Sequence, residues 1–372
     1  TTTTTTTTLN NGVHMPLIGL GTWKSPLGKT KQAVYHAVKN AGYRLIDTAN
    51  DYNNEHEIGE ALKKLLDEGV VKREDLFIQS KLWNSNHKAE FVKPDLLATL
   101  KDLNLDYIDS FIIHWPQACP ATGKAPAVRS NGTHAAPASE GTMFPYDPET
   151  LVYCSDNDTH FAETWTAMEK LVDEGLVKSI GLSNFNKTQI QEILRISKKH
   201  KPAILQNECH PYLQQKDLVD FCNFHGIIFQ AYSPLSSKDR PAHFRKKDDP
   251  ELLEDPNIRK MSKKYNKSPA QIVLHWHIAA GHAAVPKSVT PSRIEENIQV
   301  FDFQLSKEEM DVISAMNCGW RILLWPHTAT HPDYPFKDEL PFGHKVGSYK
   351  RPMQWLASSS SNKDGDKKEA RN

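Results

Sequence analysis

Several features that would place the chain in a special class are missing from its 372 residues. No apolar run reaches the roughly 18–20 residues that a transmembrane helix needs, and the start lacks the basic and apolar regions of a secretory signal. Lys plus Arg and Asp plus Glu both number 45, so no charge excess indicates a nucleic-acid partner or an acidic tail. We therefore expect a cytoplasmic protein with neither nucleic-acid nor membrane partners.

The motifs of several common chemistries are also missing. The five cysteines are scattered and form no CxxC, which argues against a disulfide framework and a zinc site, so we expect no metal. The chain has no serine nucleophile elbow, no HExxH, and no GxGxxG that opens a helix. Any nicotinamide cofactor therefore has to bind without a Rossmann fold.

Short apolar runs rich in β-branched residues alternate with amphipathic helical stretches between residues 17 and 301. This alternation gives eight strand–helix pairs, which favour an α/β fold of the closed (β/α)8 TIM-barrel type over an open doubly wound sheet. Pro94 is suited to the first turn of the third helix. Asn11-Gly12 predicts an N-terminal β-hairpin that plugs the bottom of the barrel.

The ends and two long connections differ in composition from the barrel. Residues 1–8 are all threonine, a low-complexity segment that we expect to be disordered, and residues 343–372 read as a flexible C-terminal tail. The barrel domain then spans residues 9–342. The connections 117–160 and 236–255 each follow a strand, so we expect both long loops on the C-terminal face, where barrel active sites lie.

Polar residues close the apolar runs that we interpret as strands. In a barrel these strand ends converge on one mouth, and a full ring of polar residues there is hard to explain as packing. The strand-end residues are Asp47, Lys81, His114, Ser183, Asn184, Gln206, Tyr232, Lys287 and Ser288.

The types of these residues predict a chemistry. Asp47 and Lys81 taken alone are better explained as a structural ion pair, but Tyr52 follows Asp47 by five residues. A nearby ammonium typically lowers the pKa of a phenol by about 1–3 units, which would make Tyr52 a general acid near neutral pH. His114 could orient a carbonyl. An acid without a nucleophile suggests that an oxygen is protonated while a hydride attacks the carbon.

An anion site is predicted near the end of the barrel. Lys287 and Ser288 end a strand, and Arg293 opens the helix that follows. Cations beside a helix N-terminus suit a phosphate group.

These residues lie in segments that resemble the aldo-keto reductase family, most closely its aldose and aldehyde reductase branch, from about Leu9 to about Phe342. The resemblance implies a catalytic tetrad of Asp47, Tyr52, Lys81 and His114 and the reduction of an aldehyde or ketone to an alcohol by NADPH. The segments that carry it are GLGTW, LIDTANDYNNE, GEAL, SKLW, IIHWP, GLSNF, QNECHPY, AYSPL and VPKSVTPSRIEEN.

The resemblance also implies a cofactor site. Lys287 and Arg293 would grip a 2′-phosphate, which makes the cofactor NADPH, and a salt bridge between Lys24 and Asp239 would close a loop over it. The other implied contacts are Ser183, Asn184 and Gln206 to the carboxamide, Tyr232 stacked on the nicotinamide, Ser233, Leu235 and Ser288 at the phosphates, Glu296 and Asn297 at the adenine, and Thr22, Trp23 and Asp47.

A substrate pocket walled by Trp23, Trp83 and Trp115 follows from the same comparison, with a C-terminal specificity segment at 318–342. The chain departs from the family pattern at Asp51, Ala242, Leu323 and Leu324. These departures predict a wider, more polar pocket that suits a sugar-derived aldehyde or a keto acid.

Two other functions stay open at this point. One is a non-catalytic or structural member of the same barrel family that holds NADPH without turnover, against which the complete tetrad argues. The other is a different barrel enzyme, such as a phosphosugar isomerase. The resemblance favours a monomer.

Overall fold

Eight parallel strands form the central sheet of the protein. The structure is a computed structural model, and it describes residues 5–120, 135–137, 144–146, 154–240, 245 and 247–339. The strand order is β12-β11-β10-β9-β6-β5-β4-β3. The strands are β3 (Leu20–Gly21), β4 (Leu45–Asp47), β5 (Phe77–Leu82), β6 (Ile108–Ile113), β9 (Val177–Ser183), β10 (Ile204–Glu208), β11 (Ile228–Tyr232) and β12 (Ala283–Ala284).

The sheet closes on itself, which confirms the predicted barrel. Parallel bridges join Ile18 to Ala284 and Gly21 to Lys287, so the first strand lies beside the last. A glycine is required at this seam, because a Cβ on Gly21 would lie 2.6 Å from the carbonyl oxygen of Val285. The closure brings the carboxyl ends of all eight strands to one mouth.

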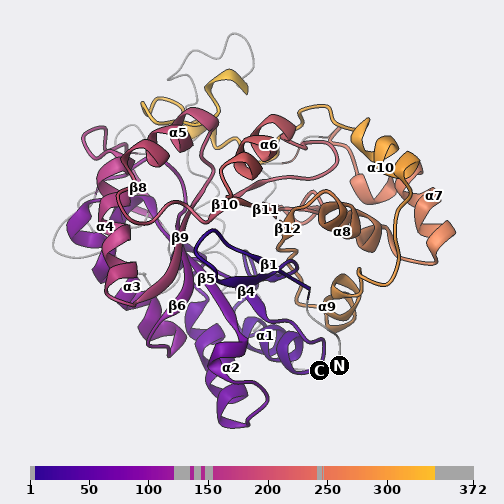
Figure 1. Cartoon of the computed structure of the whole chain (residues 1–372), viewed down its shortest axis with the longest axis horizontal. Helices are drawn as coiled ribbons and strands as arrows, with labels where there is room; N and C mark the ends of the chain where they lie inside the picture. The colour runs from indigo at the N-terminus through magenta and orange to yellow at the C-terminus, as the bar shows by residue number, and fades with distance from the viewer. Residues whose placement is uncertain are drawn as a thin grey trace, which may run out of the picture.

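Ten α-helices lie among the described residues and surround the barrel (Figure 1). Two of them, α7 and α10, fall outside the eight expected strand–helix pairs. The prediction that Pro94 opens a helix is wrong, because α3 starts five residues earlier and keeps Pro94 in its interior. The helices are α1 (Thr30–Lys39), α2 (Glu55–Asp67), α3 (Ala89–Leu103), α4 (Phe161–Asp173), α5 (Lys187–Ile196), α6 (Lys216–Phe224), α7 (Pro256–Tyr265), α8 (Pro269–Ala279), α9 (Pro291–Ile298) and α10 (Lys307–Ser314).

The helix α2 shows why these segments are helical. Ile58, Leu62 and Leu65 recur at the spacing of one helix face, and all three are fully buried in the main core. The chain then leaves the helix through Gly69, whose φ of +65° lies in the left-handed region that glycine adopts without strain. The apolar face thus fixes how the helix packs on the sheet.

A hairpin covers the amino ends of the strands, as Asn11-Gly12 predicted. Strands β1 (Thr6–Thr8) and β2 (His14–Pro16) pair antiparallel and lie across the middle of the barrel in Figure 1. The side chains of Asn10 and Asn11 donate to the carbonyl oxygens of Pro202 and Lys178, which precede or begin β10 and β9. The expectation of disorder is therefore wrong for Thr6–Thr8, because pairing with β2 satisfies their backbone groups.

Parts of the expected loops and ends lie outside the described residues. The connection 117–160 is described at its two ends and at the paired strands β7 (Ala135–Pro137) and β8 (Phe144–Tyr146), and residues 343–372 lie wholly outside. Within the described part of the chain, no helix has both the length and the apolarity to cross a membrane.

Candidate active site

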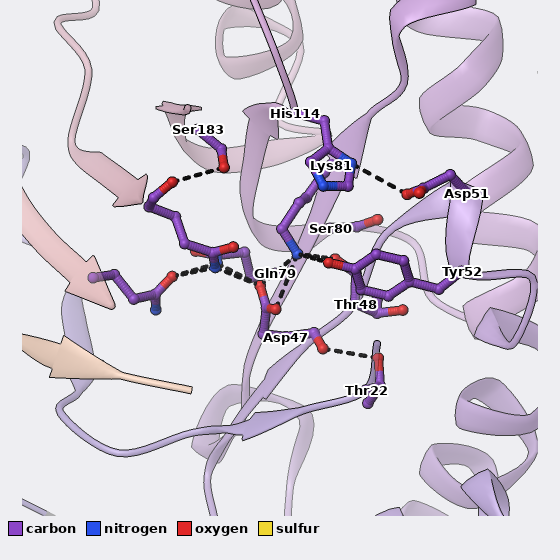
Figure 2. A network of polar contacts seen from close by, with 12 residues as sticks. Thr22, Asp47, Thr48, Asp51, Tyr52, Gln79, Ser80, Lys81, His114 and Ser183 are labelled. Carbon is purple, nitrogen blue, oxygen red and sulfur yellow. Dashed lines mark hydrogen bonds and ion pairs between the residues drawn. The ribbon is translucent and has the colours of Figure 1, made fainter. Parts of the chain in front are cut away.

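The side chains of Asp47, Lys81 and Tyr52 meet at the mouth of the barrel (Figure 2). Lys81 points inward from β5 and is fully buried, and its Nζ lies 2.9 Å from both carboxylate oxygens of Asp47 at the end of β4. The same ammonium donates to the carbonyl oxygen of Thr48 at 2.8 Å and contacts the hydroxyl oxygen of Tyr52 at 3.1 Å. The structure therefore brings together three residues that are up to 34 positions apart.

A layer of buried amides holds the Asp47 carboxylate from the opposite side. Gln79 on β5 and Gln206 on β10 donate to Oδ1 of Asp47 at 2.7 and 2.8 Å, and both also donate to Oε1 of Gln230 on β11. Gln206 lies inside β10, two residues before its end, so the expectation that it closes the strand is wrong. Gln79 and Gln230 were not predicted, because their only signal in the sequence is a polar residue inside an apolar run.

The expected lowering of the Tyr52 pKa is wrong in direction. Loss of hydration around the hydroxyl, followed by the Asp47 and Asp51 carboxylates, raises the pKa of Tyr52 well above its ordinary value. Asp47 neutralises the Lys81 ammonium on which the expectation rested, since the two form a close ion pair. Tyr52 is therefore a protonated phenol at neutral pH and remains able to donate a proton.

His114 follows the end of β6 and lies against Tyr52, with ring centroids 5.8 Å apart. Its Nδ1 faces Oδ1 of Asp51 at 3.1 Å, and the side chains are each 10% exposed. Trp83 and the imidazole pack in a T-shaped arrangement with ring centroids 5.2 Å apart. All four residues of the expected tetrad thus gather at one place, and Asp51 joins them.

The residues expected at a cofactor carboxamide form a connected set beside His114. Asn184, which adopts a left-handed φ of +61°, donates from Nδ2 to the His114 carbonyl oxygen at 3.0 Å and accepts from the Tyr232 hydroxyl at 2.7 Å. Ser183 donates to the Gln206 carbonyl oxygen at 2.7 Å. Their amide and hydroxyl groups are of the type that a carboxamide pairs with.

Cations gather where the phosphates were expected. The Asp239 carboxylate pairs with Lys287 at 2.9 Å, whereas Lys24 donates to the Asp239 backbone carbonyl oxygen rather than forming the expected salt bridge. Partial burial, with repulsion from Lys287 and Arg245, lowers the pKa of Lys24. Lys24, Lys287 and Arg245 lie close enough to repel one another, and the Asp239 carboxylate pairs with Lys287, so an anion fits the remaining positive charge.

The remaining cofactor positions lie around these cations. Arg293 is exposed in the first turn of α9, which leaves its guanidinium accessible, while Asn297 is buried and Glu296 accepts from Ser268. Ser288 accepts from the backbone N–H of Thr290 at 3.1 Å. The other expected positions are Thr22, which donates to the Asp47 carbonyl oxygen, Trp23 and Leu235, which are half-buried, and Ser233, which accepts from Ser237.

An aromatic wall lies next to His114. Trp83 and Trp115 are buried, and the ring of Trp325 packs 5.5 Å and 5.1 Å from them, with Phe336 5.9 Å from Trp115. Trp325 was missed because nothing in its local sequence places it at the barrel mouth. Half-buried Leu324 packs against the same cluster. This wall is apolar, and the wider, more polar pocket stays a prediction.

The C-terminal segment that supplies Trp325 is tied to the barrel by Glu208. The buried carboxylate of Glu208, at the end of β10, accepts from the backbone N–H groups of Ile322 and Leu323 at 2.7 and 2.8 Å and contacts His210 at 3.1 Å. Arg321 in turn pairs with Glu339 at 2.6 Å. Glu208 thus holds Leu323 through its backbone, Leu324 packs in the aromatic cluster, and their contact with a substrate stays a prediction. Ala242 lies outside the described residues.

Cys209, His277 and His282 also gather, in a buried cluster apart from the tetrad. Burial raises the pKa of the Cys209 thiol and lowers that of His282 to about 4. The two Nδ1 atoms of the histidines lie 3.3 Å apart, a separation that one neutral ring donating to the other explains. The cluster is therefore packed as uncharged groups.

Comparisons with known proteins agree with the motifs. The model of the aldo/keto reductase family matches residues 17–317. The chain is 47% identical over 342 residues to aldo-keto reductase family 1 member A1 of Xenopus tropicalis and 46% identical over 340 residues to that of Homo sapiens, with 89% of this chain and 97% of each relative covered. The solved structure of the aldose reductase from Schistosoma japonicum matches with a TM-score of 0.78 at 42% identity, covering 90% of this chain and all of that one.

The ion pair at the centre of the site predicts a stability effect. Lys81→Met keeps the apolar stem and removes the charge, which leaves Asp47 buried without its cation. We expect the free energy of unfolding to fall by about 3–5 kcal/mol, measured by urea denaturation at pH 7. The double variant, Asp47→Asn with Lys81→Met, should lose less unfolding free energy than the two single variants together. The expected difference is about 0.5–3 kcal/mol. Strictly additive losses would contradict the pairing.

Proposed function

The chain belongs to the aldo/keto reductase family, and we propose that it reduces an aldehyde or ketone to an alcohol with NADPH. The observation that supports this most is the line of contacts from Asp47 through the buried Lys81 ammonium to the Tyr52 hydroxyl, with His114 beside it. The proposed reaction uses all four residues of the tetrad, and all four are present.

In the proposed reaction, bound NADPH supplies a hydride to the carbonyl carbon. The carbonyl oxygen becomes an alkoxide and takes the proton of the Tyr52 hydroxyl. The Lys81 ammonium, 3.1 Å from the phenol oxygen, stabilises the phenolate that is left until solvent returns a proton to it. Asp47 and the amide layer hold the ammonium in place, so Tyr52 needs no rearrangement during the proton transfer.

The residues present fit an NADPH site. Ser183, Asn184 and Gln206 supply the hydroxyl and amide groups for the carboxamide, and Tyr232 offers a ring for the nicotinamide to stack on. Lys24, Lys287 and Arg293 supply more positive charge than Asp239 neutralises, which suits phosphates and a 2′-phosphate in particular. The proposed preference for NADPH over NADH rests on these cations.

For the substrate, we propose a carbonyl compound with a polar, sugar-like portion. The Asp51 carboxylate lies at the inner end of the aromatic wall, next to His114, and favours hydroxyl donors there. A protein that binds NADPH without turnover is the alternative, and the experiment below separates the two. On the family resemblance we further propose that the protein works as a monomer in the cytoplasm.

Tyr52→Phe tests the proposed reaction. We expect kcat for carbonyl reduction to fall by about 10²–10⁴, because the proton donor of the proposed reaction is removed. The measurement follows NADPH absorbance with aromatic aldehydes, aldoses, uronates and keto sugars, and tryptophan fluorescence reports NADPH binding. Tyr35→Phe, which changes a tyrosine bonded to Glu68 on the surface, is the matched control. Tight NADPH binding with no turnover by the unmodified protein would instead favour the non-catalytic alternative.

The raised pKa of Tyr52 predicts the pH dependence of both directions. Reduction needs the phenol, which stays protonated up to and beyond the ordinary tyrosine pKa of about 10, so we expect the single-turnover rate of reduction to stay flat from about pH 7 to about pH 9.5. Alcohol oxidation needs the phenolate and should rise by about tenfold per pH unit over that range. A reduction rate that halves near pH 8 would show that the Tyr52 pKa is lowered.

Arg293→Met tests the cofactor preference. The loss of a charged hydrogen bond to a 2′-phosphate should raise the Kd for NADPH by about 10–100-fold and leave the Kd for NADH nearly unchanged. Fluorescence titration with both cofactors measures this difference. Arg195→Met removes an arginine that is 74% exposed on α5 and should change neither value. Equal loss of affinity for the two cofactors would contradict a 2′-phosphate contact.

A further inference from the structure

The Asp47 carboxylate is shared between the Lys81 ammonium and two buried amides (Figure 2). Its Oδ1 atom accepts from Nε2 of Gln79 at 2.7 Å, from Nε2 of Gln206 at 2.8 Å and from Nζ of Lys81 at 2.9 Å. A carboxylate oxygen offers about two lone-pair sites. Oδ1 therefore has one nitrogen donor more than it can pair with at full strength.

The Lys81 ammonium has the opposite imbalance, since an ammonium carries three N–H donors. Four acceptors lie within 3.1 Å of its nitrogen, namely both carboxylate oxygens of Asp47, the Thr48 carbonyl oxygen and the Tyr52 hydroxyl oxygen. One of these acceptors has to do without a full hydrogen bond from Lys81. Because the two amides fill Oδ1, the ammonium can leave that oxygen at the least cost, and its third N–H is then available to Tyr52.

Gln230 fixes the direction of both amides. Its Oε1 lies 2.7 Å from Nε2 of Gln79 and 2.6 Å from Nε2 of Gln206. Each NH2 group therefore directs one hydrogen to Gln230 and the other to Asp47. The reverse orientation would place an amide oxygen against a carboxylate oxygen, and neither of these can donate. All three glutamines are buried, so bulk water does not replace these hydrogen bonds.

The barrel sets the place of Gln79. Gln79 and Lys81 are two positions apart on β5, so their side chains point to the same inner face. The register of the sheet also puts Gln79 directly beside Asp47 of β4. Gln79 is fully buried, and it therefore acts on the chemistry at the mouth through Asp47.

We propose that Gln79 is a positioning residue that keeps one N–H of Lys81 directed at the Tyr52 oxygen. It does so by occupying Oδ1 of Asp47, which the ammonium would otherwise take. The directed N–H stabilises the phenolate that forms when Tyr52 gives its proton to the alkoxide. The proposal rests on the reduction proposed above and deepens its proton-transfer step.

The first test reads the ionisation of the phenol and needs no turnover. Difluorotyrosine placed at position 52 ionises at lower pH than tyrosine, and its ¹⁹F signal follows the change from phenol to phenolate. In Gln79→Met the pH of half-ionisation should rise by about one unit, which is an about tenfold loss of phenolate stability. The reason is that Lys81 turns from the phenol to the vacated side of Oδ1. An unchanged or lowered pH of half-ionisation in Gln79→Met overturns the proposal.

Gln189→Met is the matched control for this titration. It removes another buried amide, which donates to the Asp333 carbonyl oxygen at 2.8 Å and lies on α5. We expect it to leave the pH of half-ionisation unchanged, even where it lowers the stability of the protein. Gln79→Val, with a residue type that strands favour, replaces Gln79→Met in both tests if the methionine variant does not fold.

The second test reads the reaction. The single-turnover rate of reduction should fall by about tenfold in Gln79→Met, whereas the Kd for NADPH should change by less than about twofold, because Gln79 is not among the proposed cofactor contacts. An unchanged rate, or a slower rate with an equal loss of NADPH affinity, overturns the proposal. Absence of turnover in the unsubstituted protein would instead reject the reductase function, while the ¹⁹F titration would still decide whether Gln79 directs Lys81 to Tyr52.

Discussion

The burial of the Lys81 ammonium is the constraint on which the rest of the site depends. An uncompensated charge inside a barrel would cost several kcal/mol, so the surrounding residues are arranged around it. Asp47 lies within 2.9 Å, the Thr48 carbonyl oxygen within 2.8 Å and the Tyr52 hydroxyl within 3.1 Å. The amides of Gln79 and Gln206 then satisfy the outer side of the carboxylate. Asp47, Thr48 and Tyr52 lie at or just after the end of β4, and Gln79 lies on β5 with Lys81, whereas Gln206 comes from β10, which the closed barrel brings to the carboxylate.

The same ion pair explains the state of Tyr52. An isolated ammonium would favour the phenolate, but Asp47 cancels most of that effect, and the Asp51 carboxylate adds to the cost of a second negative charge. The hydroxyl therefore stays protonated, and in the proposed reaction it is the acid that protonates the alkoxide. A site arranged in this way favours reduction at neutral pH. Asp51 thus helps to keep Tyr52 protonated through its negative charge.

In the proposed function, substrate recognition and catalysis are supplied by separate parts of the chain. The tetrad lies on the barrel, whereas the aromatic wall is completed by Trp325 from the C-terminal segment, and Glu208 helps to hold that segment by binding the backbone of Ile322 and Leu323. A buried carboxylate at the end of β10 therefore helps to shape the pocket without facing it. Changes in this segment could alter the pocket while the ion pair stays intact.

The sequence by itself determined the eight strand–helix units, the hairpin at Asn11-Gly12, and the identity of Asp47, Tyr52, Lys81 and His114, because periodicity and strand-end polarity are local and the family motifs are specific. It could not determine the direction of the Tyr52 pKa shift, the inward position of Gln206, the partner of Asp239, or the presence of Trp325 at the mouth. Each of these depends on which groups from distant segments come within about 3–6 Å of each other, and on how much water they exclude. Distances between strand ends and the loss of hydration exist only in the folded barrel, so only the tertiary structure decided them.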